Sequence, residues 1–393
     1  MTEITHAAID SWADDKDGPV ALHMRQLLLP AEVGGDIIFP PTYADIGYNI
    51  DTLSDGTKVV TIDSVGSQAN RMEPIFKSEM YAHLVPQIEI ELQDKGKQAD
   101  KYVETSSLLD LAHRSADAVV GGTPGLNQLV ADAFKALHQG NAVPLCCIAP
   151  TSLIFGVWDS RGGTGEKRPR LVRSIIRAWD VDPLHAAAQF NSVWKQLDDE
   201  QRDALEKEAK AKKVKQLSAK GLKDVPATFR KVGTTAAKHM LEYRDGSPNP
   251  ERRVLGGVRV NGRIERDVTI NLVALRSIRG PTDEETKNLR HYLLALSLLA
   301  ASHEFEYFLR EGCILRVPDA EDQWFEVPRR GDPRAIQIVP QAGPGILLGY
   351  AEAALKAFKK NWPAELKYKF DLKEAKKLLA KKDEADEQVA EAE

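Results

Sequence analysis

The sequence predicts a fold of the α+β class, and three patterns lead to this prediction. Apolar residues alternate at 58–65 and 87–92, as they do in strands with one buried face. An apolar stripe at helical spacing follows Thr123-Pro124 and predicts a helix. A capping box of Thr282 and Glu285 precedes a second, longer helix. Strands and helices therefore share the chain.

The order of these segments narrows the fold further. Once the insertions are left out, the chain reads strand, helix, strand, a later strand, long helix, strand. That order is compatible with the β-α-β-β-α-β unit of ferredoxin-like folds, which RNA-recognition modules also use. We therefore expect a ferredoxin-like sheet with large helical and β-hairpin insertions.

Composition limits the classes of partner and compartment. The 393 residues carry a net charge of -5, so any polyanion site must be a local basic patch. Cys146 and Cys147 are adjacent and Cys313 is remote, which fits neither a disulfide framework nor a metal site. We expect a reducing cytoplasm and no cofactor. The start of the chain lacks a signal-peptide pattern, and the apolar run 143–158 is broken by prolines, so no membrane span is expected.

A candidate phosphate-facing segment follows the strand predicted at 58–65. Ser67 can cap the first amides of a helix, and a helix that starts directly after a strand favours phosphate binding. Pro74 should kink or end the first helical segment. Gln68, Asn70 and Arg71 would then face a sugar-phosphate chain, or they would satisfy loop backbone groups instead.

A second candidate segment surrounds His113 and Arg114. The spacings from Asp110 to Arg114 and from His113 to Asp117 are those of ion pairs on a helix surface. A histidine beside an aspartate is also compatible with general-base chemistry. Since no motif places a serine or cysteine nucleophile nearby, we favour a structural role or RNA contact.

The most basic segment lies between two apolar runs. The run 152–158 predicts a buried strand, and the run 171–179 fits either a strand or a helix. Arg173 and Arg177 share a face in both cases, because residues four apart align on a strand and on a helix. The glycine loop 161–165 and its arginines suit a polyanion whose phosphates the backbone approaches closely. The other interpretation is a surface loop that pairs with nearby acids.

The second half of the chain contains a charged insertion and a hairpin signal. The stretch 198–223 mixes lysine and glutamate, as solvated helices do. Asn261-Gly262 stands between alternating residues and is the strongest hairpin signal in the chain, with Arg259 and Arg263 on its strands. A strand ending in Arg276 is expected next. The tail from Glu365 alternates lysine with acids, and we expect it to fray.

Five motifs in order carry a family resemblance. They are PPTY at Pro40–Tyr43, SQANRMEP at Ser67–Pro74, HRSADA at His113–Ala118, SLIFGVWDSRGG at Ser152–Gly163 and GGV at Gly256–Val258. Together they resemble the CRISPR-associated RAMP superfamily, and more narrowly the guide-RNA-binding backbone subunit of subtype I-G (formerly I-U) Cascade effector complexes. The resemblance extends from about Pro40 to Leu315 and leaves out both ends of the chain.

The resemblance implies a hand-shaped subunit. Its palm would be a modified RNA-recognition sheet, with fingers and a β-hairpin thumb as insertions. Copies would stack head to tail along the guide RNA (crRNA) and bind other effector subunits. The guide bases would stay free to pair with target DNA. No membrane partner is expected. The whole chain, 1–393, would be one domain. Its palm strands and basic glycine loop would lie at 58–92 and 143–181. Its insertions would be a helical segment at 182–243 and a hairpin region, the possible thumb, at 252–279, followed by a charged tail at 365–393.

The predicted RNA-binding residues follow from both lines of reasoning, and no catalytic or metal-binding residue is predicted. The RNA-binding set is Ser67, Gln68, Asn70, Arg71, His113, Arg114, Arg161, Lys167, Arg168, Arg170, Arg173, Arg177, Arg259, Arg263 and Arg276. We expect these arginines to form one continuous basic track from Arg71 to Arg173. The thumb is assigned to the Asn261-Gly262 hairpin, with the Gly162 loop as the competing choice.

Two other functions stay open at this point. A RAMP-type endoribonuclease would use a loop aspartate, for which Asp63, Asp110 and Asp159 are the candidates. A metabolic enzyme would use the glycine loop for phosphate. Against the latter, the segment after Gly162 lacks the spacing of a P-loop, and no dinucleotide fingerprint or zinc motif is present.

Overall fold

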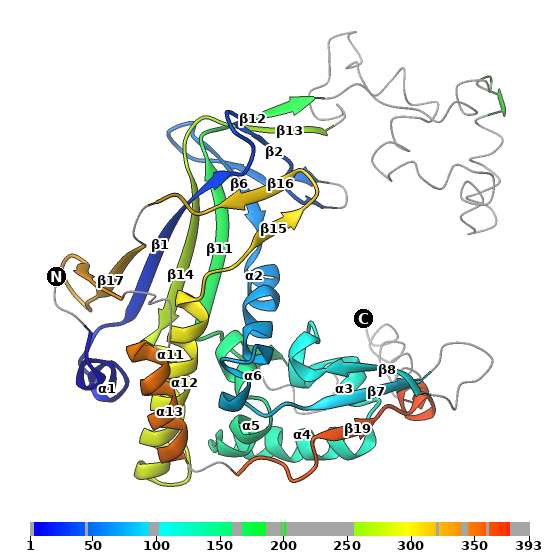
Figure 1. Cartoon of the computed structure of the whole chain (residues 1–393), viewed down its shortest axis with the longest axis vertical. Helices are drawn as coiled ribbons and strands as arrows, with labels where there is room; N and C mark the ends of the chain where they lie inside the picture. Colours follow the sequence, from blue (N-terminus) through cyan, green and yellow to red (C-terminus); the bar gives the residue numbers. More distant parts are fainter. Residues whose placement is uncertain are drawn as a thin grey trace, which may run out of the picture.

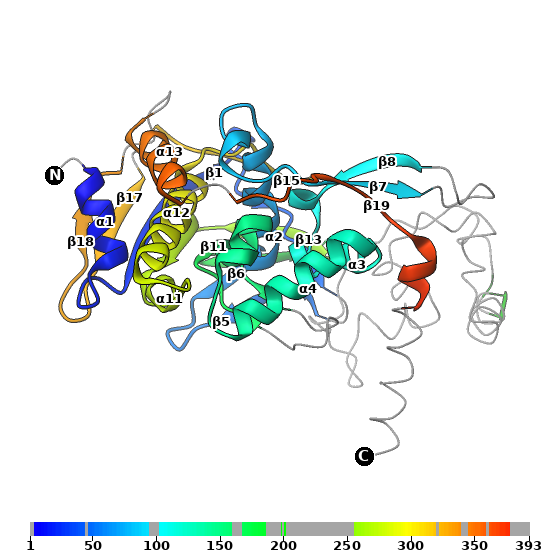
Figure 2. The same cartoon turned by 90° about the horizontal axis from the view of Figure 1, so that it is seen from below.

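The computed structural model describes residues 4–43, 46–93, 102–158, 167–185, 198, 200–201, 255–319, 322–338, 345–358 and 361–377. These residues form many helices and many strands, as Figures 1 and 2 show, and the predicted α+β class is confirmed. The Gly162 loop, the charged stretch and nearly all of the predicted helical insertion lie outside the described residues.

A large antiparallel sheet forms the centre of the molecule (Figure 1). Its strands in spatial order are β15 (Tyr307–Arg310), β16 (Cys313–Arg316), β1 (Ala21–Pro30), β14 (Ile264–Asn271), β11 (Val172–Trp179), β6 (Lys58–Asp63) and β5 (Ile50–Thr52). β17 (Gln323–Val327) also pairs with β1, and β18 (Arg334–Ile336) pairs with β17. β1 therefore pairs with β14 along one edge and with β16 and β17 along the other.

Two apolar segments of the chain, one of which sequence patterns left open between strand and helix, are strands with one buried face. The segment 22–29 is the strand β1, in which Leu22, Met24 and Leu28 are buried on one face and Leu27 is exposed on the other. The segment 171–179 contains the strand β11, whose residues alternate in the same way over most of its length. A period of two is the property of a strand with one covered face.

Four strands of this sheet are connected through helices. Their order along the chain is β1, β11, β14, β17, and their order in space is β17, β1, β14, β11. Several helices separate β1 from β11, and α12 (Asp283–Ser302) separates β14 from β17. This order is compatible with a β-α-β-β-α-β unit, and β6 and β5 extend the sheet beyond β11.

Helices pack on one face of the sheet (Figures 1 and 2). They are α1 (His6–Asp14), α2 (Val65–Met72), α3 (Ala118–Gly121), α4 (Pro124–His138), α5 (Val143–Ile148), α6 (Pro150–Phe155), α11 (Leu272–Ser277), α12 and α13 (Ile346–Phe358). α2, α6 and α12 contact β11 directly. Within the described residues, none of these helices is long and apolar enough to cross a bilayer.

The long helix α12 confirms the prediction made from its capping box. The Thr282 hydroxyl accepts the backbone N–H of Glu285 at 3.2 Å and donates to its carboxylate at 2.7 Å. The leucines at 289, 293, 296 and 299 are all buried in the main core. The cap and the apolar stripe therefore act together to place this helix on the sheet.

The other described strands form smaller sheets. They join β7 (Glu89–Gln93) with β8 (Tyr102–Ser107) and β19 (Lys367–Lys369), β2 (Ile37–Ile38) with β13 (Leu255–Val260) and β12 (Val181–His185), β3 (Thr42–Tyr43) with β4 (Gly47–Tyr48), and β9 (Val157–Trp158) with β10 (Lys167–Arg168). The expectation that the chain frays from Glu365 is wrong for β19, because this strand pairs in parallel with β7.

The predicted Asn261-Gly262 hairpin is also wrong. β13 does not fold back on β14, because β13 pairs with β12 while β14 pairs with β11. The N–H groups of Asn261 and Gly262 donate to the carbonyls of Trp179 and Asp180 on the neighbouring strand. The two strand pairs therefore form one bent ribbon, and the bend replaces the turn that the local signal indicates.

The strand predicted at 152–158 is wrong for most of its length. Pro150–Phe155 forms α6, all of whose residues are buried, and only Val157 and Trp158 are in a strand. Gly156 separates the two with a φ of +83°, which favours glycine. A short apolar run does not distinguish a buried strand from a buried helix, and packing decided between them.

Candidate nucleic-acid interface

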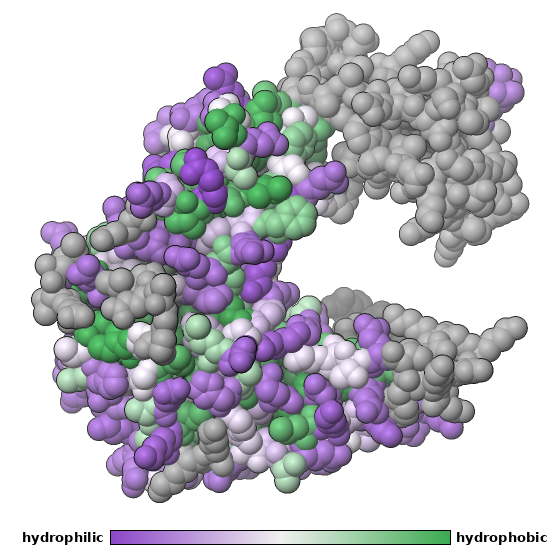
Figure 3. All heavy atoms as spheres, viewed as in Figure 1, coloured by the Kyte–Doolittle hydropathy of each residue, from purple (hydrophilic) through white to green (hydrophobic). Residues whose placement is uncertain are grey.

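Helix α2 begins directly after the central strand β6 and lies on the side where the molecule is hollowed (Figures 1 and 3). The helix is capped by Ser64, whose hydroxyl accepts the N–H of Ser67 at 3.3 Å. The prediction of Ser67 as the cap is wrong, because Ser67 already lies inside the helix. As expected, α2 ends before Pro74, and a short 3₁₀ turn follows.

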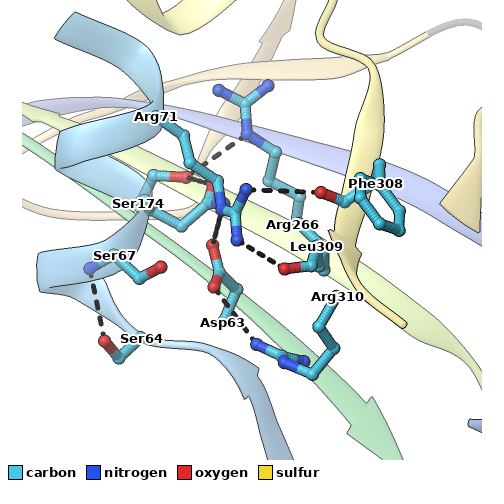
Figure 4. Close-up of polar contacts among 10 residues, drawn as sticks. Asp63, Ser64, Ser67, Arg71, Ser174, Arg266, Phe308, Leu309 and Arg310 are labelled. Carbon is cyan, nitrogen blue, oxygen red and sulfur yellow. Dashed lines mark hydrogen bonds and ion pairs between the residues drawn. The ribbon is translucent and has the colours of Figure 1, made fainter. Parts of the chain in front are cut away.

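A buried carboxylate organises the polar side chains of this region. Asp63 is 1% exposed, and its Oδ2 accepts from Gln68 Nε2 at 2.7 Å and from Arg71 Nε at 3.1 Å. The guanidinium of Arg310 lies 3.6 Å from Asp63 Oδ1. Figure 4 shows Arg71 and Arg310 converging on Asp63 from α2 and from β15. One acid at the end of β6 therefore holds two arginines together.

The position of Arg71 is determined by more than this ion pair. Its Nη2 donates to the carbonyl of Leu309 at 2.8 Å, and its Nη1 lies 3.4 Å from the carbonyl of Phe308. The side chain still exposes 36% of its surface. A guanidinium fixed in this way loses little further freedom when it binds a phosphate. We call Ser67, Asn70, Arg71 and Arg310 the α2 site.

Gln68 belongs to the buried network beneath the α2 site. Its side-chain oxygen accepts from Ser174 at 2.7 Å, and the Arg266 guanidinium donates to the same serine hydroxyl at 3.3 Å. Arg266 is completely buried and also donates to the hydroxyl of Tyr307. The predicted RNA contact of Gln68 is therefore wrong, since this amide connects α2 to the sheet.

Arg114 is buried, and it positions the exposed Asn70. Its Nε lies 2.7 Å from the carboxylate of Glu73, and its Nη2 donates to Asn70 Oδ1 at 3.2 Å. Its guanidinium also lies over the ring of Phe155, 5.3 Å from the centroid. The backbone of Arg114 has a φ of +53°, a left-handed conformation that costs a non-glycine residue about 1 kcal/mol. The predicted direct RNA contact is wrong, and Arg114 supports the α2 site from below.

The partner of Arg114 has an altered acidity. Burial raises the pKa of Glu73 to about 7, against the opposing attraction of the Arg114 charge and a hydrogen bond from Thr151. Burial likewise lowers the pKa of Arg114. The carboxyl of Glu73 therefore titrates close to neutral pH directly beneath the α2 site.

The neighbouring segment does not form the helical ion pairs that spacing predicts. Asp110 pairs with Lys77 at 2.6 Å and not with Arg114. His113 is exposed, and its backbone N–H donates to Asp117 at 3.1 Å. These residues lie in 3₁₀ turns, in which the i to i+4 spacing of an α-helix does not apply. His113 stays a candidate for RNA contact.

The basic residues after the glycine loop lie at the β9–β10 hairpin. The ammonium group of Lys167 lies over the exposed ring of Trp158, 5.5 Å from its centroid. Arg168 donates to the carbonyl of Leu137 at 3.2 Å, which attaches this strand to α4. Arg170 is exposed. Arg161 and Asp159 lie outside the described residues.

Arg173 and Arg177 share one face of β11, as predicted, but it is the face away from α2. Ser174 reaches Gln68 on α2, so its neighbour Arg173 points to the opposite side of the sheet. Register places Arg173 beside Thr269 and Arg177 beside Glu265. The predicted continuous track from Arg71 to Arg173 is therefore wrong.

This second surface, which we call the open face, carries both signs of charge. Its carboxylates are Glu265 and Asp267 on β14. Arg25 lies 3.6 Å from Glu265, and His23 lies 3.5 Å from Asp267. Burial works to raise the pKa of Asp267, but its hydrogen bond from His23 and the nearby positive charges lower it overall. The open face is thus a mixed ionic surface.

The remaining predicted contacts are distributed over the molecule. Arg263 lies 2.7 Å from Glu265 and stacks 4.9 Å from the centroid of Trp179, so it belongs to the open face. Arg259 is exposed on β13. Arg276 donates to the carbonyls of Trp12 and Pro19 and joins α11 to α1. Arg276 thus lies far from α2 in a contact between two helices, and its role in RNA binding stays a prediction.

Sequence reasoning missed Arg310 and Phe308. Both lie on β15, which pairs with β16 and reaches the α2 site only through the tertiary fold. The sole local signal was the alternation of Tyr307, Phe308, Leu309 and Arg310.

Within the described chain, no group of three or more histidine, cysteine, aspartate or glutamate side chains could hold a metal ion.

A comparison with protein-family models finds a match in the N-terminal part of the chain. Residues 22–183 match the model of a family described as CRISPR-associated protein GSU0053. This segment contains β1, β6, α2 and β11, and so includes most of the α2 site and the strands beneath it. No curated protein sequence matches the chain.

Proposed function

Because residues 22–183 match a family of CRISPR-associated proteins, we propose that the chain is a RAMP-type, guide-RNA-binding backbone subunit of a type I effector complex. In this proposal the guide runs through the hollow along α2. Further copies bind head to tail along the same guide, together with other effector subunits. The α2 site is the observation on which the proposal rests.

The chemistry of the α2 site suits sugar and phosphate. Two arginines converge on the buried Asp63, and the exposed Asn70 and half-buried Ser67 add neutral hydrogen-bonding groups. Contacts of this kind position a nucleic acid without reading its sequence. A guide held by its backbone keeps its base edges free to pair with target DNA, which a subunit that must accept any guide requires.

The proposal describes a binding protein without catalysis. Of the aspartates considered for a ribonuclease, Asp63 is 1% exposed and already accepts from Gln68 and Arg71. Asp110 is paired with Lys77. Labelled RNA incubated with the purified protein and magnesium or manganese should stay intact, and specific cleavage that is lost in Asp110→Asn would favour the ribonuclease alternative.

The direct test is RNA binding measured by fluorescence anisotropy. Arg71→Gln is expected to weaken binding of a single-stranded RNA about tenfold and to reduce the dependence of affinity on salt by about one counterion. Arg334→Gln is the matched control, because Arg334 is an exposed arginine on the distant strand β18. Unchanged affinity in a folded Arg71→Gln protein would count against the proposal.

A further inference from the structure

Two large apolar side chains are exposed next to the α2 site. Phe308 on β15 is 61% exposed and Ile314 on β16 is 51% exposed. The two residues are direct partners in the antiparallel pairing of these strands, so their side chains lie side by side on one face. We call this pair the apolar step.

The apolar step is not the result of a shifted register. Tyr307, Leu309, Cys313 and Leu315 alternate with the step residues and are all buried against apolar side chains of β1, β6 and β11. The hairpin is thus anchored by one face and presents the step on the other. Exposed apolar groups that adjoin polar residues on a fixed element commonly mark a binding surface.

The backbone under the step is held in place from two sides. Gly312, at the hairpin turn, has a φ of +75°, and a Cβ there would lie 2.8 Å from the ring of Phe39. The Gly312 carbonyl accepts the N–H of Phe39 at 3.0 Å, and the Ile314 carbonyl accepts that of Ala31 at 2.9 Å. The close packing of Phe39 on the turn leaves little room for the hairpin to move.

The step is joined to the positive charges of the α2 site through one strand. The Arg71 guanidinium contacts the carbonyls of Phe308 and Leu309, and the next residue, Arg310, pairs with Asp63. Figure 4 shows the Phe308 carbonyl turned towards Arg71 and its ring on the other side of the strand. In Figure 3, apolar atoms over β15 and β16 adjoin the hollow.

We infer that the apolar step is a stacking platform for a nucleobase of the strand whose phosphates the α2 site holds. This inference rests on the proposed function. The base is the preferred occupant because a flat apolar surface beside two arginines matches a nucleotide, which has a flat apolar base and an anionic phosphate. Every base has a π-face, so stacking adds affinity without sequence preference.

The test separates stacking from phosphate binding by the choice of ligand. Anisotropy is measured on the full chain with an oligouridine RNA and with an oligomer of equal length whose sugars are abasic. Phe308→Ala is expected to bind the RNA about tenfold more weakly and the abasic oligomer unchanged. Arg71→Gln should weaken both. Phe308→Trp should keep full affinity, because it retains a stacking surface.

Leu27→Ala provides the matched control. Leu27 is a large side chain, 41% exposed, on the face of β1 that lies away from α2. Its removal should change neither affinity. If Phe308→Ala also leaves the affinity for RNA unchanged, or lowers both affinities equally, the stacking inference fails while the proposed function stands.

Two further outcomes identify a different error. If the wild-type chain binds neither oligomer, the proposed function fails and the inference fails with it. If Phe308→Ala keeps its RNA affinity but abolishes self-association in analytical ultracentrifugation, the step is a contact between protein copies. That result overturns stacking and leaves RNA binding in place.

Discussion

The two faces of the central sheet both carry arginines, but they hold them in different ways. On the helix-covered face, Arg71 and Arg310 converge on one carboxylate, Asp63, that water does not reach. On the open face, Arg25 and Arg263 surround Glu265 and leave much of their own surface exposed. In the first arrangement both arginines are themselves partly covered, whereas in the second about half of each arginine side chain stays exposed above a buried acid.

The difference shows that an arginine's role depends on its partners more than on its exposure. The donors of Arg71 are divided between a buried acid on β6 and two backbone carbonyls on β15, so its orientation is set by three acceptors on two strands. Arg25 has only long ion-pair distances of 3.6 and 3.9 Å. Pairs at these distances contribute little to stability, because the half-exposed guanidinium of Arg25 is already well hydrated, although Glu265 itself is largely buried.

The largest expected effect is that of removing the buried acid. Asp63→Ala should lower the free energy of unfolding by about 3 to 5 kcal/mol, since it leaves two guanidinium groups without their shared carboxylate. Asp267→Ala, the corresponding change on the open face, should cost about 1 kcal/mol. Urea denaturation measures both, and Asp63→Asn serves if the alanine variant does not fold. Equal losses would mean that the two faces are energetically alike.

The pH dependence of stability gives the second test. The pKa of Glu73 is raised from 4.5 to about 7, so between these values the folded protein keeps a proton that the unfolded chain has lost. The free energy of unfolding should therefore fall by about 3 kcal/mol as pH rises through this window.

Glu73→Gln removes this titration and should flatten the profile, whereas Glu79→Gln, at an exposed position, should leave it as it is. Urea unfolding between pH 5 and 8 provides the measurement. A profile that keeps its slope in Glu73→Gln would show that another group titrates in this window.

RNA affinity distinguishes the two faces of the sheet directly. The double variant Arg173→Gln/Arg177→Gln should weaken RNA binding by less than about threefold, against about tenfold for Arg71→Gln, because the open face lies on the other side of the sheet from α2. The same anisotropy assay, repeated at several salt concentrations, measures both losses of affinity. A larger loss in the double variant would move the guide to the open face.

The smallest effect is expected at Arg25. Its side chain is 46% exposed, so Arg25→Ala should change the free energy of unfolding by less than about 0.5 kcal/mol. The change should disappear in 1 M salt, where screening removes what remains of the ion pairs. A loss that persists at high salt would show that Arg25 packs against the sheet and does not act by its charge.

Local patterns predicted the elements whose signals and packing agree. The Thr282 cap and its leucine stripe led to α12, and the shared face of Arg173 and Arg177 followed from spacing alone. Patterns failed where a distant strand supplied the partner. Asn261-Gly262 indicates a hairpin turn, yet β12 and β11 pair with its flanking strands, and the two residues form a bend.

Only those residues of the candidate site that belong to a local pattern were predicted from the sequence. Asn70 and Arg71 were recognised on α2, because a helix directly after a strand is a local pattern. Gln68 and Arg114 were misassigned, since only the fold shows that they are buried. Phe308 and Arg310 follow α2 by more than two hundred residues in the sequence, so no local pattern could show that they contact it.

The amino-acid sequence by itself determined the class of the fold, the main capped helices, the local character of the basic segments and the family resemblance. These properties depend on neighbours within about one helical turn or one strand. Tertiary structure alone decided which face of the sheet each arginine occupies and which acid it meets. Burial and strand pairing join residues far apart in the chain. Only the fold therefore decides whether an arginine is fixed by a buried acid and two carbonyls, as Arg71 is, or stays half exposed in a loose ion pair, as Arg25 does.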